Sequence, residues 1–486
     1  ECCVAICTFK YGIFEPMATN KTYDQIKVGD TAEIVRECSS NDLLVFAHAS
    51  GNHNPIHLPD TDWTGDGLVD KPVAPAMWVG GLASAVLGNI LPGPGTIYKA
   101  QSFRFLSGAA VGDKLHVRVT ATEKRPDNIV LFDMSVTRGD GTRLVEGVAE
   151  VAAPTELIEF DSSDIPAILV QRHRHFNRMI ELAKTLPALP TAVAAPDDPN
   201  SLEGALMAAR EGLIMPILIG AKSRIEAAAK ELDEDLGPYE LIDIEDEMEA
   251  AGRAVALVHE GRVKAVMKGH LHTDHLLHHV VKRDGGLRTK RRISHVFVMD
   301  IPGRKTPVLI SDAAINITPD LNTKVDITQN AIDAALSLGL EMPRVGVLSA
   351  IETVNPAIPS SLDAAVLSKM AERGQITGAI VDGPLAMDNA VDVQAARTKG
   401  ITSLVAGHAE VLIVPNLESG NMLAKELTFI AHAEAAGLVI GAKVPIMLTS
   451  RADDSRARLA SCALALLYMH WQATGNPAGI LDRDGE

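Results

Sequence analysis

The chain is poor in cysteine, in net positive charge and in long apolar runs, and each shortage argues against a class of protein. Five cysteines among 486 residues form no disulfide framework and no C-x-x-C pair, so we expect a reducing, cytoplasmic location. A formal net charge of −17 would repel phosphate groups, and no nucleic acid partner is expected. No apolar run approaches the roughly 18 residues of a membrane span, so no membrane partner is expected either.

The chain is too long for a single core, and its two parts differ in the periodicity of their apolar residues. Up to about residue 153, apolar residues alternate with period two in His116–Thr120, Ile129–Arg138 and Arg143–Val151, which predicts an antiparallel sheet. The preceding stretch Val73–Leu91 is apolar nearly all round, so we expect a helix buried on every side. One buried helix wrapped by a meandering sheet is an α+β hot-dog domain, expected over residues 17–153.

A second domain is expected over residues 166–486, after a non-periodic linker. Apolar runs alternate there with amphipathic stretches such as Val325–Leu338 and Asn421–Ala436. This alternation predicts βαβ units, a mainly parallel sheet and a two-lobed α/β domain. The candidate strands are Ile214–Ile219, Arg253–Val258, His295–Met299, Val308–Ile310, Arg344–Leu348, Ala379–Val381, Val411–Val414 and Ala442–Leu448.

Two polar segments directly follow apolar runs of this second domain. Thr449–Asp454 combines a hydroxyl, a guanidinium and two carboxylates behind Gly437–Leu448. Asp382–Asp388 follows Ile376–Val381 and has an acid at each end. Open α/β sheets bind ligands at the carboxyl ends of their strands, so both segments are candidate site segments.

Together with Lys268–Thr273 and Ser311–Asn316, these segments resemble the phosphate acetyltransferase/phosphate butyryltransferase family in residues and in order. The resemblance covers roughly residues 166–486. It implies exchange of a short acyl group between coenzyme A and phosphate: acetyl-CoA + phosphate = acetyl phosphate + CoA. The expected partners are acyl-CoA, phosphate and acyl phosphate, with CoA as a substrate and no permanently bound cofactor.

The resemblance implies that Ser450 and Arg451 stabilise the reacting acyl phosphate and that an aspartate takes the proton of the CoA thiol. In the acetyltransferase pattern this acid lies several residues further on. Here Asp453 and Asp454 come sooner, as in butyryltransferase-like members, and Asp454 is our candidate base. The alternative is that these aspartates cap a helix that begins near Ala457. The candidate substrate-binding residues are Lys268, His272, Thr273, Asn316, Asp382 and Asp388.

The segment after Lys268 also raises the question of a metal site. Lys268 and Thr273 suit phosphate binding, with the N-terminus of a helix behind them. His275 and His279 would share one face of that helix, with the spacing of zinc ligands. No H-E-x-x-H arrangement or cysteine accompanies them, so we expect hydrogen-bonded histidines and no metal.

A basic run, Lys282–Arg292, holds six of the chain's positive charges. It is either a solvated loop or a binding surface for the phosphates of CoA.

In the first domain, Ala47–His57 resembles the signature of MaoC-like R-specific enoyl-CoA hydratases, and roughly residues 20–152 match that hot-dog family. The family motif uses an aspartate and a histidine to activate the water that adds to the enoyl thioester. His57 fits the histidine, but Asn52 occupies the aspartate position and is no carboxylate base. A further departure is Ala76, where the family usually has glycine. A slow hydratase, a hydratase that uses His53 as its base and an acyl-CoA-binding module stay open.

We therefore predict an acyltransferase fused to a MaoC-like domain of doubtful activity, assembled at least as a dimer. A phosphate butyryltransferase and a non-catalytic acyl-CoA-binding scaffold or sensor are the alternatives. A decarboxylating dehydrogenase would share the two-lobed architecture. No G-x-G-x-x-G loop follows an early strand, which weakens the case for a nucleotide cofactor.

Overall fold

The computed structural model describes residues 17–65, 69–161, 174–448 and 455–479. The chain divides into two compact units, Glu1–Val170 and Gln171–Glu486, and each is described by itself.

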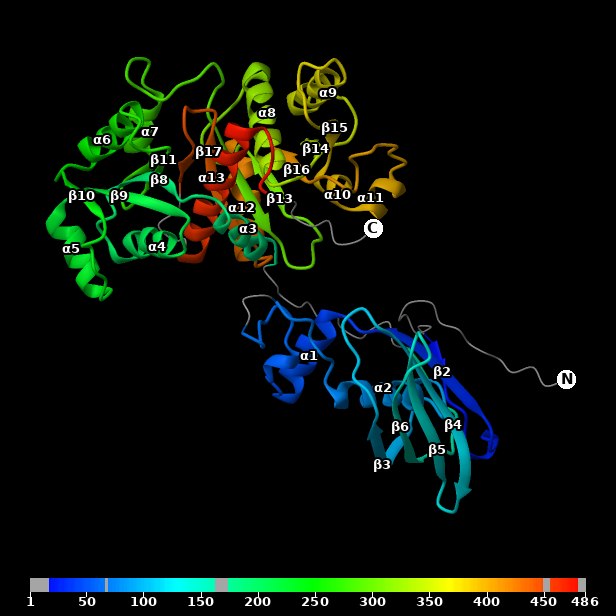
Figure 1. The fold of residues 1–486 in the computed structure, drawn as a ribbon. Coiled ribbons are helices and arrows are strands. Elements are labelled where there is room, and N and C mark those ends of the chain that lie inside the picture. The colour runs from blue at the N-terminus through cyan, green and yellow to red at the C-terminus, as the bar shows by residue number, and fades with distance from the viewer. Residues whose placement is uncertain (1–16, 66–68, 162–173, 449–454, 480–486) are drawn as a thin grey trace. The chain divides into compact units, whose positions relative to one another are not determined.

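The N-terminal unit is a five-stranded antiparallel sheet with strand order β2-β4-β5-β6-β3, and helix α2 packs against it (Figure 1). A further short pair, β1 with β7, joins the two ends of the unit. The elements are β1 (Met17–Thr19), β2 (Thr31–Glu37), α1 (Ser40–Ser50), α2 (Ala76–Asn89), β3 (Ile97–Phe105), β4 (Lys114–Arg125), β5 (Ile129–Arg138), β6 (Arg143–Ala152) and β7 (Glu159–Asp161).

The period-two pattern of the sequence is the reason for this arrangement. In β4, Leu115, Val117 and Val119 are buried while the residues between them are more exposed. The buried side chains pack with those of α2 into one core, which confirms the hot-dog fold. The prediction that this helix is buried on every side was wrong, because Met77 and Gly81 lie on an exposed face of α2.

The C-terminal unit is built on an eleven-stranded mixed sheet with strand order β10-β9-β8-β11-β18-β17-β12-β13-β16-β14-β15 (Figure 1). The strands are β8 (Leu189–Ala194), β9 (Ile214–Gly220), β10 (Glu240–Asp243), β11 (Ala265–Lys268), β12 (Ser294–Asp300), β13 (Val308–Ser311), β14 (Arg344–Leu348), β15 (Ile380–Leu385), β16 (Val411–Ile413), β17 (Glu434–Ile440) and β18 (Ile446–Met447).

Two parallel blocks make up this sheet, and they run in opposite directions. One block is β10-β9-β8-β11-β18 and the other is β13-β16-β14-β15. Between them, β17 and β12 form three successive antiparallel pairings. The mainly parallel, two-lobed α/β prediction is therefore confirmed. The two blocks point in opposite directions. Their carboxyl ends nevertheless meet at one level, because Met267 near the end of β11 and Ser311 at the end of β13 lie in the same row of paired residues.

Helices cover both faces of the sheet, because successive strand residues face opposite sides. Val193 packs into one core cluster with α4 and α13, whereas Ala192 and Ala194 pack into another with α6 and α7. The helices are α3 (Arg174–Lys184), α4 (Pro199–Arg210), α5 (Lys222–Glu231), α6 (Glu247–His259), α7 (Thr273–Val281), α8 (Leu321–Ser337), α9 (Pro359–Glu372), α10 (Met387–Val391), α11 (Val393–Thr398), α12 (Leu417–Phe429) and α13 (Ser455–Thr474).

Three of the predicted elements need correction. Arg253–Val258 was predicted as a strand but belongs to α6, where Asp246 caps the helix and Ala250, Ala254 and Leu257 recur on its buried face. The predicted helix Asn421–Ala436 ends at Phe429, and β17 then begins. The predicted strand Ala442–Leu448 is reduced to the two residues of β18. Short apolar runs fit either a helix or a strand, and tertiary packing decides between them.

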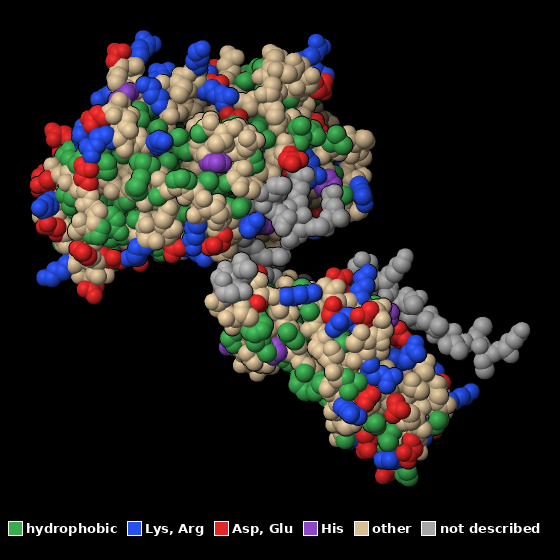
Figure 2. All heavy atoms as spheres, in the orientation of Figure 1, with side chains coloured by type: hydrophobic (Ala, Val, Ile, Leu, Met, Phe, Trp, Pro, Cys, Tyr) green, Lys and Arg blue, Asp and Glu red, His purple; other side chains and the backbone are tan. Residues whose placement is uncertain are grey.

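Acidic and basic side chains are intermixed over the visible surface of each unit (Figure 2). Among the described helices, none combines the length and the apolar character needed to cross a membrane.

Candidate functional site

The carboxyl ends of β8, β11 and β18 lie side by side at one edge of the C-terminal sheet. In β11, Val266 and Met267 pair with Ile446 and Met447 of β18, so Lys268 comes level with Leu448. The predicted residues Ser450, Arg451 and Asp454 follow in the sequence but lie outside the described residues.

Lys268 shapes the loop that leaves β11. Its side chain is buried, and the ammonium donates to the carbonyl oxygens of Gly269 (3.1 Å) and Leu271 (3.3 Å). The N–H of Gly269 donates to Ala194 O (2.8 Å), and the N–H of His270 donates to Ala195 O (2.7 Å). The loop is thereby held from within and also against the end of β8.

Close packing requires glycine at position 269. A Cβ built there would lie 2.3 Å from the carbonyl oxygen of Ala195, a backbone atom that cannot move aside alone. Ala195 itself has a φ of 51°, which a residue with a side chain seldom adopts. Such backbone conformations persist only where their surroundings enforce them, and they concentrate at functional sites.

Three charged or titratable side chains meet beside this loop. The Asp197 carboxylate follows β8 and is almost completely buried. Its Oδ2 accepts a hydrogen bond from Arg224 Nε of α5 (2.7 Å), and its Oδ1 lies 3.7 Å from His270 Nδ1. Asp197 is not among the predicted site residues, because Leu189–Ala194 was not recognised as a strand. An acid directly behind that apolar run was the available signal.

His272 and Thr273 begin α7 at the same edge. His272 is the exposed N-cap residue and Thr273 is the first helical residue, so the predicted helix does begin behind Lys268. The ring centroid of His272 lies 5.6 Å from that of His275, and His275 Nδ1 lies 3.6 Å from Glu247 Oε2. Within the described ranges, no group of three or more His, Cys, Asp or Glu side chains is arranged to hold a metal ion.

Asn316 belongs to a different part of the sheet, at the end of β13. Its amide donates to Asp312 Oδ2 (2.6 Å) and to the carbonyl of Ile293 (2.9 Å). The buried Asp312 carboxylate also accepts the N–H groups of Ala314 (3.0 Å) and Ile315 (3.1 Å). Asn316 and Asp312 therefore close a turn that ties β13 to the start of β12.

Asp382 and Asp388 lie on the last strand of the sheet and just beyond it. Asp382 is within β15, and its Oδ1 accepts the N–H of Gly383 (2.8 Å). Asp388 is exposed in α10 and lies 3.3 Å from Lys399 Nζ, which also bonds Glu352 (3.1 Å). The N–H of Asn389, aided by Lys399, holds the pKa of Asp388 below its ordinary value.

The candidate substrate-binding residues thus form two groups. Lys268, His272 and Thr273 gather at the carboxyl end of β11. Asn316, Asp382 and Asp388 lie on or behind strands of the opposite direction, β13 and β15. The two groups lie at a similar level along the strands but on different strands of the sheet. Seven strand spacings separate β11 from β15, which is roughly 34 Å at about 4.8 Å per spacing.

The basic run Lys282–Arg292 is partly engaged in ion pairs with α8. Arg291 pairs with Asp333, and Arg292 Nη1 lies 3.9 Å from Asp326. Ion pairing by these two arginines reduces the positive charge that the run can offer to a ligand.

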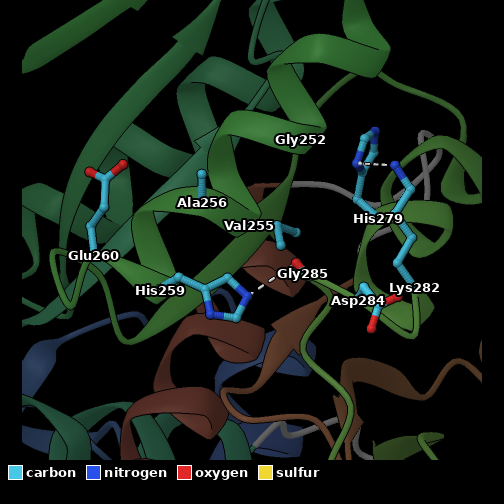
Figure 3. Close-up of a pocket in the computed structure, with 9 residues that line it drawn as sticks. All are labelled: Gly252, Val255, Ala256, His259, Glu260, His279, Lys282, Asp284 and Gly285. Carbon is cyan, nitrogen blue, oxygen red and sulfur yellow. Dashed lines mark hydrogen bonds between the residues drawn. The ribbon is translucent and has the colours of Figure 1, made fainter.

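A cavity of about 530 Å³ lies beside the C-terminal ends of α6 and α7 (Figure 3). His259 Nε2 lies 3.1 Å from the carbonyl oxygen of Gly285, and His279 Nδ1 lies 3.3 Å from Lys282 Nζ. Burial lowers the pKa of His279, and the positive charge of Lys282 lowers it further. The lining residues are Gly252, Val255, Ala256, His259, Glu260, His279, Lys282, Asp284 and Gly285. None of them is a candidate catalytic or substrate-binding residue of the acyl-transfer site, although Lys282 begins the basic run.

In the N-terminal unit, the loop that carries Asn52 and His57 is hydrogen-bonded to Val73, in the segment before α2. The N–H of Val73 donates to the carbonyl of Ile56 (2.9 Å), and His57 Nδ1 lies 2.7 Å from Val73 O. A carbonyl accepts only, so Nδ1 carries the hydrogen and Nε2 is left as the basic nitrogen. Asn52 is exposed, and its Oδ1 accepts the N–H of Asn54 (3.2 Å).

Comparison with known proteins agrees with both resemblances. Residues 247–466 match the model of the phosphate acetyl/butaryl transferase family, and residues 21–138 match that of the MaoC like domain.

The similar proteins include two curated transferases and one solved structure. A phosphate acetyltransferase of Rhizobium meliloti is 58% identical over 293 residues, which are 60% of this chain and 93% of the relative. A phosphate butyryltransferase of Clostridium beijerinckii is 39% identical over 294 residues, 60% of this chain and 97% of the relative. The crystal structure of a branched-chain phosphotransacylase from Enterococcus faecalis V583 matches with a TM-score of 0.52 and 31% identity, covering 58% of this chain and 99% of that one.

The sheet order, the loop at the end of β11 and near-complete coverage of these relatives lead to one assignment. The chain belongs to the phosphate acetyl/butyryl transferase family and has a MaoC-like domain ahead of its transferase part.

Proposed function

We propose that the chain is an acyltransferase that exchanges a short acyl group between coenzyme A and phosphate, with acetyl-CoA + phosphate = acetyl phosphate + CoA as its reaction. The observation that carries the proposal is the 58% identity to a phosphate acetyltransferase over 93% of its length. Identity to a butyryltransferase is 39%, so the acetyl reading is favoured over the butyryl one. CoA is a substrate in this proposal, and no resident cofactor is required.

The proposed roles follow the chemistry of acyl transfer. Ser450 and Arg451 stabilise the acyl phosphate, and Asp454 is a candidate for the thiol base. Lys268 and Thr273, at the start of α7, support phosphate binding through the helix N-terminus. His272, Asn316, Asp382 and Asp388 stay proposed substrate-binding residues, and the distance between the two groups makes Asn316 and Asp388 the ones to test first.

The decisive assay measures phosphate-dependent release of CoA from acetyl-, propionyl- and butyryl-CoA by the full chain. Arg451→Ala is expected to lower kcat/KM by about 10- to 150-fold, because a lost charge-assisted contact costs about 1.5–3 kcal/mol. Undiminished activity would remove Arg451 from the proposal. Absence of CoA release with all three substrates would favour an acyl-CoA-binding scaffold or sensor instead.

For the N-terminal part we propose an acyl-CoA-handling MaoC-like domain, bounded by residues 17–153, ahead of a transferase domain over residues 166–486. The hydrogen bond between His57 and the carbonyl of Val73 orients the imidazole, which supports hydratase activity. The amide of Asn52 in place of a carboxylate argues against that activity. A cytoplasmic location is part of the proposal, on the basis of cysteine content alone.

We also propose at least a dimer. β2 and β3 are the edge strands of the five-stranded sheet, and Ile97 and Phe105 at the ends of β3 are exposed. Exposed apolar edges are commonly covered by a second copy. A monomeric mass by light scattering at micromolar concentration would contradict this.

A further inference from the structure

None of the roles proposed above uses the pair formed by Asp197 and His270. Both residues lie at the edge of the sheet where β8, β11 and β18 end. The Asp197 side chain is only 4% exposed, whereas that of His270 is 45% exposed. A buried carboxylate that orients an accessible imidazole is suited to proton transfer with a bound ligand.

The carboxylate has one satisfied oxygen and one that faces the imidazole. Arg224 binds Oδ2 and also donates to the carbonyl of Glu245 (3.3 Å), which anchors the guanidinium. Oδ1 is buried, accepts no hydrogen bond from the residues that the structure describes and lies 3.7 Å from His270 Nδ1. Hydrogen bonds between catalytic groups are often long in the free protein and shorten when the substrate binds.

The backbone around His270 is held in place by hydrogen bonds and close packing. Its N–H is bound to Ala195 O, Gly269 permits the close approach, and the Lys268 ammonium bonds the carbonyls on either side of His270. Among the described residues, the charged groups on this side of the sheet are Asp197 and Arg224, from the β8 and α5 side, and Lys268 from β11. His272 is a further titratable group on the same loop as His270.

We propose that His270, oriented by Asp197, takes the proton of the CoA thiol during acyl transfer. The inference rests on the proposed function, and Asp454 is the competing candidate for the same role. With Nδ1–H directed to Asp197, Nε2 is the basic nitrogen and faces away from the carboxylate. Asp197 is a positioning residue, because it acts through the imidazole.

The step balances as follows. The sulfur of CoA bonds to the carbonyl carbon of the acyl phosphate while its proton passes to His270 Nε2. The carbon–oxygen bond to phosphate then breaks, and phosphate leaves with the bonding electrons. The imidazolium returns its proton to water before the next turnover. In the reverse direction the imidazolium protonates the departing thiolate.

The test uses the full chain and follows acetyl-CoA formation from acetyl phosphate and CoA across pH. His270→Gln is expected to lower kcat by about 10²–10⁴-fold, with little change in the KM for CoA. Asp197→Asn is expected to lower kcat with little change in the KM for CoA, because the imidazole loses the carboxylate that fixes its orientation and tautomer. Imidazole added to His270→Ala is expected to restore part of the rate, which a purely structural role would not allow.

His278→Gln, a change at an exposed histidine of α7, is the matched control and is expected to keep wild-type kinetics. Wild-type kcat and pH profile in His270→Gln would overturn the inference. So would an acidic limb that disappears in Asp454→Asn and persists in the His270 variants, and so would loss of activity with no rescue by imidazole. A wild-type chain that transfers no acyl group would overturn the proposed function, and this inference with it.

Discussion

The backbone N–H of His295 donates to the carboxylate of Asp312, 3.2 Å away, across the antiparallel pair β12 and β13. The imidazole is almost completely buried, and its ring centroid lies 4.3 Å from that of Phe297. A Cβ built at Gly437 would lie 2.8 Å from His295 Nε2 and 3.5 Å from Leu448 O, so the ring lies near the root of the segment that begins at Thr449.

Burial lowers the pKa of His295 from 6.5 to about 4, although Asp312 opposes this shift. Between pH 6.5 and 4 the unfolded chain therefore binds a proton that the folded chain does not. The free energy of unfolding of the C-terminal unit should fall as pH decreases through this window, by on the order of 3 kcal/mol. Urea unfolding at several pH values measures it. His295→Phe should remove that part of the pH dependence, and an unchanged slope would contradict the assignment.

Gly269→Ala should damage both stability and activity. The added methyl group would meet the Ala195 carbonyl at 2.3 Å, and relieving such overlap typically costs about 1–3 kcal/mol. It would also shift the loop that carries His270. Gly88→Ala is the matched control, because nothing lies within 4 Å of its built Cβ in α2. That change should be neutral or stabilising by up to about 1 kcal/mol. Equal urea midpoints for the two variants would refute the steric argument.

The N-terminal unit offers a gain-of-function experiment. Asn52→Asp should raise hydration of crotonyl-CoA, because a carboxylate can act as the base that an amide cannot. His57→Ala should abolish any hydration, since His57 Nε2 is the basic nitrogen that the bond to Val73 leaves available. His53→Ala tests the adjacent alternative base. Turnover by the unchanged chain at an ordinary hydratase rate would show that Asn52 is no obstacle.

The basic run should contribute to CoA binding through the residues that α8 does not neutralise. Replacing Arg283, Arg288 and Lys290 by Gln should raise the KM for CoA, and added salt should reduce the effect. Arg291→Gln, which breaks the pair with Asp333, should instead affect stability more than KM. Dephospho-CoA should respond less than CoA. Identical responses would exclude the 3′-phosphate as the group that the run binds.

The sequence alone determined the two domain types, because each rests on a local period. Alternation in β4 to β6 specified a sheet with one buried face, and alternating apolar and amphipathic stretches specified the α/β unit. It also predicted that a helix begins behind Lys268 and Thr273, and α7 begins there.

Tertiary structure decided the direction of the strands and which side chains meet. Periodicity carries no information on strand order or direction. The strand order places six strands between β11, which ends at Lys268, and β15, which precedes Asp388. Likewise, Asp197 and His270 meet because β8 and β11 are neighbours, although α4, α5 and α6 lie between them in the chain. Local preference acts over a few residues, whereas these relationships depend on long-range pairing of buried strands.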